Sequence, residues 1–413
     1  MINVLKEKLK ERLGLHYWPY RKKIQLKRDL FFEETKANYN HQVSKWPSPL
    51  RNRMLNEHKL PVPNNSEFAN HHLLTETQNQ RKKNNKKPHI LIVTQKWMAS
   101  VPQKGAHFSH AILFGTLDTI DIASYSKFYY DEYFYMHQKK SDAALIELCK
   151  SLQPDLLFFS YSSHFQPSFG TIKFIKKKLG IPVVIAWWEV YGYEDFIAPY
   201  IDVNIVPHST IIKRTKYPEK YLQMWMPSNP KIFFNPKLER TIPISFVGSA
   251  PKTHNRFDER WNGLEALKNN GIQVCRDGGV FQGENFLSIV EFAKILQSSK
   301  ITLSFGQGQD FDYRTKEGII PHTKLRIFEA TLCGAMLLDS AASETQLWFE
   351  PYVDYVPFEN EQDLVDKARY FLEKEEERLE IANNGYQKTL QKYTGQLYWQ
   401  TILERLGFKV VPN

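Results

Sequence analysis

The sequence predicts an α/β protein with two Rossmann-like domains that face each other across a cleft, preceded by a basic N-terminal extension. Short runs of consecutive apolar residues alternate with segments of helical periodicity, which is typical of parallel sheets covered by helices on both faces. The alternation stops in a passage that contains Pro227, Pro230 and Pro236, and then begins again. A chain of 413 residues has room for two such domains and an extension.

The extension differs from the rest of the chain in its charge. Residues 1–88 hold 19 Lys and Arg against 8 Asp and Glu, whereas the remaining residues are almost neutral. Residues 78–87 contain almost nothing apolar, and we interpret them as a linker. A basic segment of this kind suits anionic lipid, nucleic acid or an acidic polymer. We expect four parts: the extension with its linker (1–88), an N-terminal domain (89–235), a C-terminal domain (236–385) and a C-terminal helix (386–413).

In the first domain, apolar runs predict strands and the 3.6-residue spacing predicts helices. The run HILIV at residues 89–93 indicates a short buried strand. A helix over residues 168–179 is expected to end at Gly180, which suits a left-handed C-cap. The other predicted strands are residues 118–123, 155–160, 181–187 and 203–206, and the other predicted helix is residues 142–152.

In the second domain, the alternation starts again with a strand at residues 242–247. The remaining predicted strands are residues 272–275, 301–305 and 335–338. The predicted helices are residues 256–269, 287–298, 323–333, 362–383 and 386–406. Ligands of such folds bind outside the carboxyl ends of the strands, so we expect the site in the cleft between the domains.

The composition excludes several classes of protein. Cys149, Cys275 and Cys333 are too far apart for a disulfide scaffold or a Cys-only zinc site, and they fit a reducing compartment. No apolar run approaches the ~20 residues of a membrane-spanning helix. No secretory signal is visible, so we expect a cytoplasmic protein. The first strand is not followed by G-x-G-x-x-G, which argues against a standard dinucleotide dehydrogenase.

The segment HTKLRIFEATLCGAMLLD, residues 322–339, resembles the C-terminal half of group-1 glycosyltransferases, and most closely their spore-maturation-protein-like branch. The resemblance continues in FVGS at residues 246–249, and more loosely in the first-half runs PDLLFFSYSSH, IPVVIAWWE and DVNIVPHS. These enzymes have the GT-B fold, in which two Rossmann-like domains face each other and the second binds a nucleotide-sugar. The resemblance implies this fold and a glycosyltransferase activity for the chain.

The donor site is expected around the predicted helix at residues 323–333, which follows a loop that contains Gly306. Free N–H groups at a helix N-terminus attract a diphosphate, and Lys324 adds a cation in the first turn. Glu329 is suited to accept two hydrogen bonds from a ribose diol. Arg326 lies three residues before Glu329 on the same face, so the alternative is a surface ion pair on a core helix.

Gly248 and Ser249 follow the first strand of the second domain. A glycine there lets the backbone approach a ligand closely, and the alternative is a plain strand-to-helix turn. The resemblance implies a basic residue near the phosphates a few positions later, for which Lys252 and Arg256 are the candidates. We predict that these residues take part in binding the nucleotide-sugar.

Three histidines and a glutamate are candidates for the acceptor side. The resemblance implies that His164, just past a strand, lies near the transferred sugar; the alternative is an ordinary loop histidine. Glu189 ends another strand, where it can act as a base or anchor an acceptor hydroxyl, unless it is a capping carboxylate. His107 and His110 are expected to line the same side. No third ligand accompanies them, so we predict no metal site.

The sequence departs from the family pattern at Pro321. Many group-1 enzymes carry a glutamate at this place, eight residues before the one that Glu329 matches, and it usually touches the donor sugar. The sugar and the stereochemical outcome therefore stay open.

We predict a glycosyltransferase that needs no metal and no cofactor and moves a sugar from a nucleotide-sugar to a glycan, a lipid or another acceptor. The alternative is a non-catalytic binding protein with a degenerate body and a basic arm for membrane or nucleic acid. Nucleic acid is disfavoured because the basic residues are confined to the extension. Tyr17, Trp18 and Tyr20 lie beside basic residues, which suggests peripheral contact with an anionic membrane; a solvated tail or a packed flap is the alternative.

Overall fold

The computed structural model describes residues 87–97, 107–137, 139–161, 165–189, 194–250, 258–278, 287–309 and 319–408. The chain divides into two compact units, residues 1–70 with 132–140 and residues 71–131 with 141–413. All the β-strands described below belong to the second unit. Apart from Lys87 and Pro88, the predicted basic extension lies outside the described residues.

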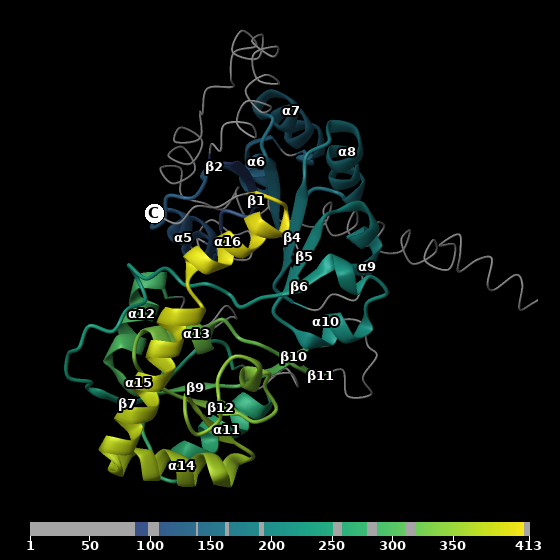
Figure 1. Ribbon diagram of the computed structural model, residues 1–413. Helices are drawn as coiled ribbons and strands as arrows, with labels where there is room; N and C mark the ends of the chain where they lie inside the picture. The colour runs from purple at the N-terminus through teal and green to yellow at the C-terminus, as the bar shows by residue number, and fades with distance from the viewer. Residues whose placement is uncertain are drawn as a thin grey trace, which may run out of the picture. The chain divides into compact units, whose positions relative to one another are not determined.

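The first half contains six strands: β1 (His89–Thr94), β2 (Ser124–Tyr129), β3 (Leu156–Tyr161), β4 (Val183–Trp187), β5 (Val203–Val206) and β6 (Tyr221–Gln223). They form one parallel sheet in the order β2-β1-β3-β4-β5-β6 (Figure 1). Every residue of β3 and β4 is buried. Continuous apolar runs form these central strands because a parallel sheet is covered on both faces.

Short helices join these strands: α5 (Gly115–Leu117), α6 (Tyr130–His137), α7 (Asp142–Leu152), α8 (Phe169–Leu179), α9 (Glu194–Ile197) and α10 (Ser209–Arg214). A π-helical turn (His110–Phe114) and two 3₁₀ turns (Ala198–Tyr200 and Pro218–Lys220) complete this half. The Ser168 hydroxyl caps α8 by accepting the N–H of Thr171 at 3.2 Å. The predicted C-cap, Gly180, has a φ of +70° and ends the helix in the left-handed conformation.

The strand predicted at residues 118–123 is wrong. The chain turns there, and the edge strand of the sheet is β2, which begins at Ser124 and pairs only with β1. Ile122 is buried and Ile120 packs against the same core from this turn, which explains their apolar character. No residue of β2 is fully buried, because an edge strand is covered less than a central one, and its hydrophobic pattern is therefore weak.

The second half contains a five-stranded parallel sheet and a separate antiparallel ribbon. The sheet has the order β13-β12-β9-β7-β8, and the ribbon pairs β10 with β11. The three-residue strands carry too little periodicity to be predicted from the sequence. The strands are β7 (Ile242–Val247), β8 (Val274–Asp277), β9 (Ser299–Ser304), β10 (Gln307–Gln309), β11 (Ile319–Pro321), β12 (Met336–Ser340) and β13 (Val356–Phe358).

The helices of the second half are α11 (Asp258–Asn269), α12 (Ile289–Ser298), α13 (Arg326–Leu332), α14 (Glu361–Glu373) and α15 (Glu375–Lys392), and α16 (Gly395–Arg405) follows them. The predicted helices at 362–383 and 386–406 therefore break at different places, at Lys374 and at residues 393–394. The hydroxyl of Thr394 caps α16 by accepting the N–H of Leu397 at 3.2 Å.

Helix α16 returns to the first half and packs beside α5 (Figure 1). The indole N–H of Trp399 donates to the hydroxyl of Thr116 at 3.0 Å, and its ring lies 5.0 Å from that of Phe158 in β3. Trp399 and Phe158 belong to the same buried cluster as Phe328 of α13. Helix α16 thus shares one hydrophobic core with both halves.

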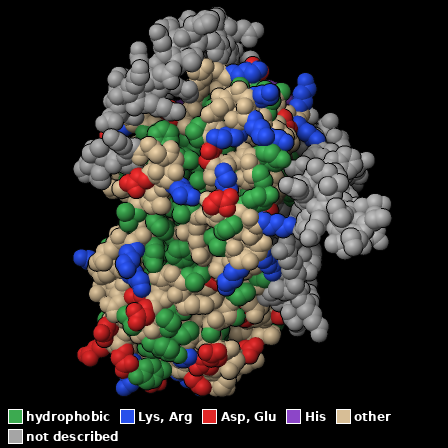
Figure 2. All heavy atoms as spheres, turned by 45° about the vertical axis from the view of Figure 1, so that its right-hand side comes forward, with side chains coloured by type: hydrophobic (Ala, Val, Ile, Leu, Met, Phe, Trp, Pro, Cys, Tyr) green, Lys and Arg blue, Asp and Glu red, His purple; other side chains and the backbone are tan. Residues whose placement is uncertain are grey.

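The two halves differ in surface charge on the face shown in Figure 2. Lys and Arg gather over the upper part, where the first half lies, and Asp and Glu gather over the lower part. Helix α8 alone carries Lys173, Lys176, Lys177 and Lys178 and no acidic residue. Within the described ranges, no helix has both the length and the apolar character needed to cross a membrane.

Candidate functional site

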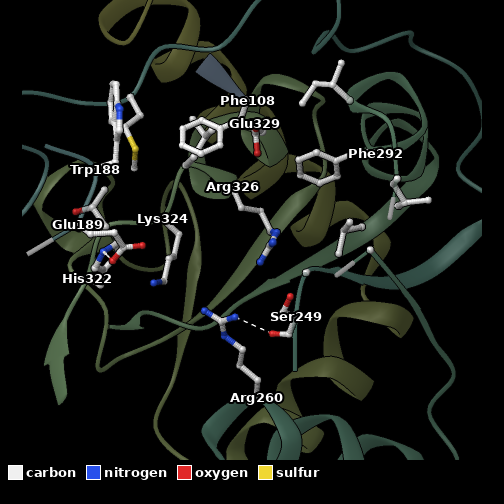
Figure 3. A pocket seen from close by; sticks show the side chains of 18 residues that line it. Phe108, Trp188, Glu189, Ser249, Arg260, Phe292, His322, Lys324, Arg326 and Glu329 are labelled. Carbon is white, nitrogen blue, oxygen red and sulfur yellow. Dashed lines mark hydrogen bonds and ion pairs between the residues drawn. The ribbon is translucent and has the colours of Figure 1, made fainter. Parts of the chain in front are cut away.

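A pocket of about 330 Å³ lies where strand ends of both halves meet (Figure 3). Trp188 and Glu189, which follow β4, line it from the first half. Gly248 and Ser249, which follow β7, line it from the second half together with residues 322–326. This is the place that the sequence predicts for a ligand, outside the carboxyl ends of parallel strands.

Half of the predicted site residues line this pocket: Glu189, Gly248, Ser249, Lys324, Arg326 and Glu329. Three other candidates are described but are not among the lining residues: Gly306, His107 and His110. The remaining candidates lie outside the described residues: His164, Lys252 and Arg256. The pocket therefore brings together the donor candidates of the FVGS and KLRIFE segments and one acceptor candidate.

Glu329 is a buried acidic residue in the wall of the pocket. It lies in α13 and is only 3% exposed. Burial raises the pKa of its carboxyl to about 8, and Arg326 offsets only part of this effect. No ion pair joins Arg326 and Glu329 in the described part of the chain, so the alternative of a surface ion pair does not apply. The carboxyl is available to accept hydrogen bonds from a ligand.

The side chain of Arg326 occupies the space beside Gly248. Its guanidinium lies 5.0 Å from the ring centre of Phe246, and its Nε is buried without a hydrogen-bond partner. Gly248 has a φ of +147°, and a Cβ at this position would lie 2.6 Å from Nη2 of Arg326. The positive φ therefore favours glycine at this position, whereas the contact with Arg326 involves the movable end of a flexible side chain.

Lys324 lies before the helix rather than in its first turn. The predicted start of this helix at residue 323 is wrong, because α13 begins at Arg326. Burial lowers the pKa of Lys324 to about 7; Glu189 opposes this effect, and Arg260 and Arg326 add to it. Its ammonium makes no hydrogen bond to another described residue. Figure 3 shows it extending between Glu189 and Arg260.

Arg260 is a pocket residue that the sequence analysis missed. It lies in the first turn of α11, and its Nη1 donates to the backbone oxygen of Ser249 at 2.8 Å. Arg260, Lys324 and Arg326 bring three cationic side chains to one pocket. The available signal was its spacing of four residues from the candidate Arg256, which predicts a shared helix face.

Glu189 pairs with His322 across the two halves. Nε2 of His322 donates to Oε2 of Glu189 at 3.0 Å, and 45% of the glutamate side chain remains exposed. Burial by itself raises the pKa of Glu189, but His322 and the Lys324 cation outweigh it and hold the pKa well below its usual value. Burial and Lys324 lower the pKa of His322, and Glu189 opposes this effect. The carboxylate is ionised and open to the pocket.

His208 lies behind this pair, between the two halves. Its Nε2 donates to the backbone oxygen of Trp188 at 3.1 Å, and its Nδ1 accepts the backbone N–H of Thr323 at 3.3 Å. Its ring centre lies 3.7 Å from that of His322. Burial and the neighbouring His322 hold the pKa of His208 well below its usual value. Sequence reasoning had no signal for this residue, because its partners are distant in the chain.

Further hydrogen bonds join the halves next to His208. The hydroxyl of Thr323 donates to the backbone oxygen of Pro207 at 3.1 Å. The backbone N–H and the hydroxyl of Ser209 both donate to the carboxylate of Glu344. Thr323 is thus held by the first half, which explains why α13 starts three residues later than its sequence predicts.

The candidates outside the pocket have other partners. Gly306 packs so closely on Ser343 that a Cβ would lie 1.8 Å from the serine Cβ. His107 hydrogen-bonds to Ser109, and burial lowers its pKa to about 3. His110 stacks on Tyr129 at 5.4 Å, and burial lowers its pKa to about 4. Among the described residues, no group of three or more His, Cys, Asp and Glu has the arrangement of a metal site.

Residues 233–404 match the model of the family described as glycosyl transferase-like. No curated protein sequence matches the chain. Among solved structures, HepE from Anabaena in complex with UDP-glucose is similar with a TM-score of 0.55 at 12% identity, over 78% of this chain and 99% of HepE. A glycosyltransferase from Rickettsia africae is similar with a TM-score of 0.51 at 11% identity, over 78% of this chain and 99% of that one. These likenesses confirm the predicted fold of two Rossmann-like domains.

Proposed function

We propose that this chain, a glycosyltransferase of the GT-B fold, takes a sugar from a nucleoside-diphosphate donor bound in the pocket around Glu329 and transfers it to a hydroxyl group of an acceptor. One observation carries the proposal: a buried carboxyl lines the same pocket of about 330 Å³ as three cationic side chains. Among the described residues, this carboxyl has no ion-pair partner. A nucleoside diphosphate has a ribose diol for the carboxyl and a diphosphate for the cations. The UDP-glucose complex of HepE, which has the same fold, supports this assignment.

Glu329 is suited to the ribose end of the donor. A carboxylate accepts hydrogen bonds from both hydroxyls of a diol, and bonds to a charged acceptor contribute about 1.5–3 kcal/mol each. Because the pKa of the free carboxyl is about 8, it holds a proton at neutral pH. Binding of the diol favours the ionised form, so donor binding is expected to release this proton.

The three cationic side chains are suited to the diphosphate. Arg326 lies against Gly248 and Arg260 donates to the backbone oxygen of Ser249. Lys324 extends between Glu189 and Arg260 (Figure 3). In sugar transfer, negative charge develops on the leaving diphosphate, and fixed cations in a buried pocket stabilise that charge. Side chains are sufficient for this role, and we propose that the reaction needs no metal ion.

The end of the pocket near Glu189 is suited to the transferred sugar and the acceptor hydroxyl. Phe108 and Trp188 line it with apolar rings, and the exposed carboxylate of Glu189 accepts hydrogen bonds from hydroxyl groups. A carboxylate with a lowered pKa is a weak base, so we assign Glu189 the role of a hydroxyl anchor. A glycan or the glycan head of a lipid presents such hydroxyls.

For residues 1–88 we propose peripheral contact of a cytoplasmic enzyme with an anionic membrane, which rests on the excess of basic residues there. Cosedimentation with vesicles of anionic and of neutral lipid, at low and high salt, tests this proposal. The matched variant of the full chain has five basic residues changed to Gln: Arg81, Lys82, Lys83, Lys86 and Lys87. Equal binding of both chains to anionic vesicles, or binding by neither, would contradict the role of this segment.

A thermal-shift panel of nucleotide-sugars tests the proposed function. A donor at 100 times its dissociation constant stabilises the protein by about 2.7 kcal/mol. A measurement of nucleoside diphosphate release from the selected donor then distinguishes an enzyme from a protein that only binds the donor. A chain that is stabilised by no nucleotide-sugar would contradict the proposal, and stabilisation without any release would leave only the binding role.

A further inference from the structure

Both ring nitrogens of His208 are engaged with backbone atoms on opposite walls of the pocket. His208 follows β5 and is 0% exposed, and it is not among the residues that line the pocket. Nε2 donates to the oxygen of Trp188 in the first half, and Nδ1 accepts the N–H of Thr323 in the second half. The ring is therefore a bridge between the two halves.

Each end of this bridge lies one residue before a charged side chain of the site. Trp188 precedes Glu189, and Thr323 precedes Lys324. A shift of either backbone group therefore moves the side chain that follows it. Misplacement of a reacting group by about 1 Å can cost on the order of a hundredfold in rate.

We infer that His208 is a positioning residue for sugar transfer: by holding the Trp188 oxygen and the Thr323 N–H, it sets the Glu189 carboxylate and the Lys324 ammonium relative to each other. The inference rests on the proposed function, which assigns those two side chains to the sugar and the diphosphate. His208 acts through its neighbours and does not touch the substrate.

The bridge requires a neutral imidazole with its proton on Nε2. A proton on Nδ1 would point toward the N–H of Thr323 and break that bond. The surroundings favour the neutral form, because His208 is buried and its ring centre lies 3.7 Å from that of His322, with the two rings tilted by 42°. Since Nε2 of His322 also donates to Glu189, the ring of His208 supports that carboxylate by a second route.

Two substitutions separate the two bonds of His208. Asn places an amide oxygen near the position of Nδ1 but is too short to reach Trp188, so His208→Asn keeps an acceptor for Thr323. Gln reaches the position of Nε2 but offers no acceptor in place of Nδ1, so His208→Gln keeps only the bond to Trp188. If His208 only stabilised the fold, the two variants would have the same activity.

The experiment measures kcat and KM for nucleoside diphosphate release, using the UDP-sugar that stabilises the wild type most. For His208→Gln we expect kcat to fall about tenfold or more while KM stays within about threefold, since the ribose end of the pocket is untouched. For His208→Asn we expect kcat to recover severalfold relative to the Gln variant, because the backbone before Lys324 is held again.

Trp187→Phe is the matched control. Its indole N–H donates to Asn204 at 2.7 Å, so the substitution also breaks a buried bond between β4 and β5, but it spares both bonds of His208. We expect this control to lower the unfolding temperature without changing kcat by more than about twofold.

The possible outcomes separate the inference from the function on which it rests. Equal kcat for the Asn and Gln variants would overturn the positioning role. Losses in kcat that are proportional to the decrease in unfolding temperature would overturn it as well. A wild-type protein that neither binds nor cleaves any UDP-sugar would overturn the proposed function and the inference with it.

Discussion

Glu189 and Glu329 line the same pocket, one in the wall from the first half and one in the wall from the second, and their pKa values shift in opposite directions. Glu189 accepts an N–H from His322, faces Lys324 and remains 45% exposed, so its pKa lies below the usual value. Glu329 is 3% exposed, and burial raises its pKa to about 8.

The difference shows how one pocket provides two kinds of carboxyl. The partners of Glu189 are part of the protein, so this carboxylate is charged before any ligand arrives. Glu329 has no such partner within the described chain, so it becomes charged only when a ligand supplies hydrogen bonds. We therefore assign donor recognition to the second wall and hydroxyl anchoring at the reacting end to the first.

The largest expected effect comes from Lys324, which extends between Glu189 and Arg260 (Figure 3). Lys324→Met removes the cation that faces the leaving diphosphate while keeping an unbranched side chain. We expect kcat to fall by about 10²–10³-fold, since loss of one fixed group that stabilises transition-state charge has this effect. Steady-state rates of UDP release measure it, and a loss below about threefold would remove Lys324 from the mechanism.

The next effect separates the two carboxyls in donor binding. Glu329→Ala or Glu329→Gln should weaken UDP-sugar binding by about 2–3 kcal/mol, because both diol bonds to the carboxylate are lost. Glu189→Gln is the matched control, and we expect its donor affinity to stay within about threefold of the wild type. Calorimetry measures the affinity of each variant for the donor. Equal affinities for the wild type and the Glu329 variants would contradict the assignment of Glu329 to the ribose.

Glu189 should show the opposite behaviour, because its substitution is expected to change turnover and not donor binding. Glu189→Gln should lower kcat by about tenfold or more, because an amide is a weaker acceptor for a hydroxyl and loses the attraction to Lys324. His322 still has a partner in this variant, namely the amide oxygen. If kcat is unchanged while the affinity for the donor falls, the roles assigned to the two walls are reversed.

A smaller effect concerns the stability of the free protein. Folding raises the pKa of Glu329, so the stability that its protonated carboxyl contributes is fully present below about pH 4.5 and is lost as the pH rises through about 8. Glu329→Gln avoids the free-energy cost of a buried charge. This variant should therefore unfold at a higher temperature than the wild type at pH 9, with a smaller difference at pH 5. A difference that does not depend on pH would show that Glu329 has a partner in the free protein.

Local elements were well predicted from the sequence. Helix α7 and strands β5 and β7 have the predicted bounds, because periodicity, caps and apolar runs are properties of consecutive residues. Edge strand β2 and the three-residue strands were missed, since partial burial leaves little pattern.

The donor candidates were predicted because Gly248, Lys324, Arg326 and Glu329 belong to two contiguous motifs. The bridge through His208 could not be predicted in this way. Its partner Thr323 is 115 residues away in the sequence, and contacts between the halves have no period. The same contacts delay the start of α13, which helix propensity alone places at residue 323.

The most direct test of the account is the proton balance of donor binding. At pH 6.5 the Glu329 carboxyl is protonated in the free protein, and a UDP-sugar, unlike UDP, has no phosphate group that titrates in this range. Calorimetry in buffers of different ionisation enthalpy measures the protons exchanged on binding. We predict that the wild type releases close to one proton more than Glu329→Gln, in which only Lys324, whose pKa is about 7, changes its protonation when the diphosphate binds. Equal proton exchange by the wild type and Glu329→Gln would contradict the claim that a ligand ionises Glu329.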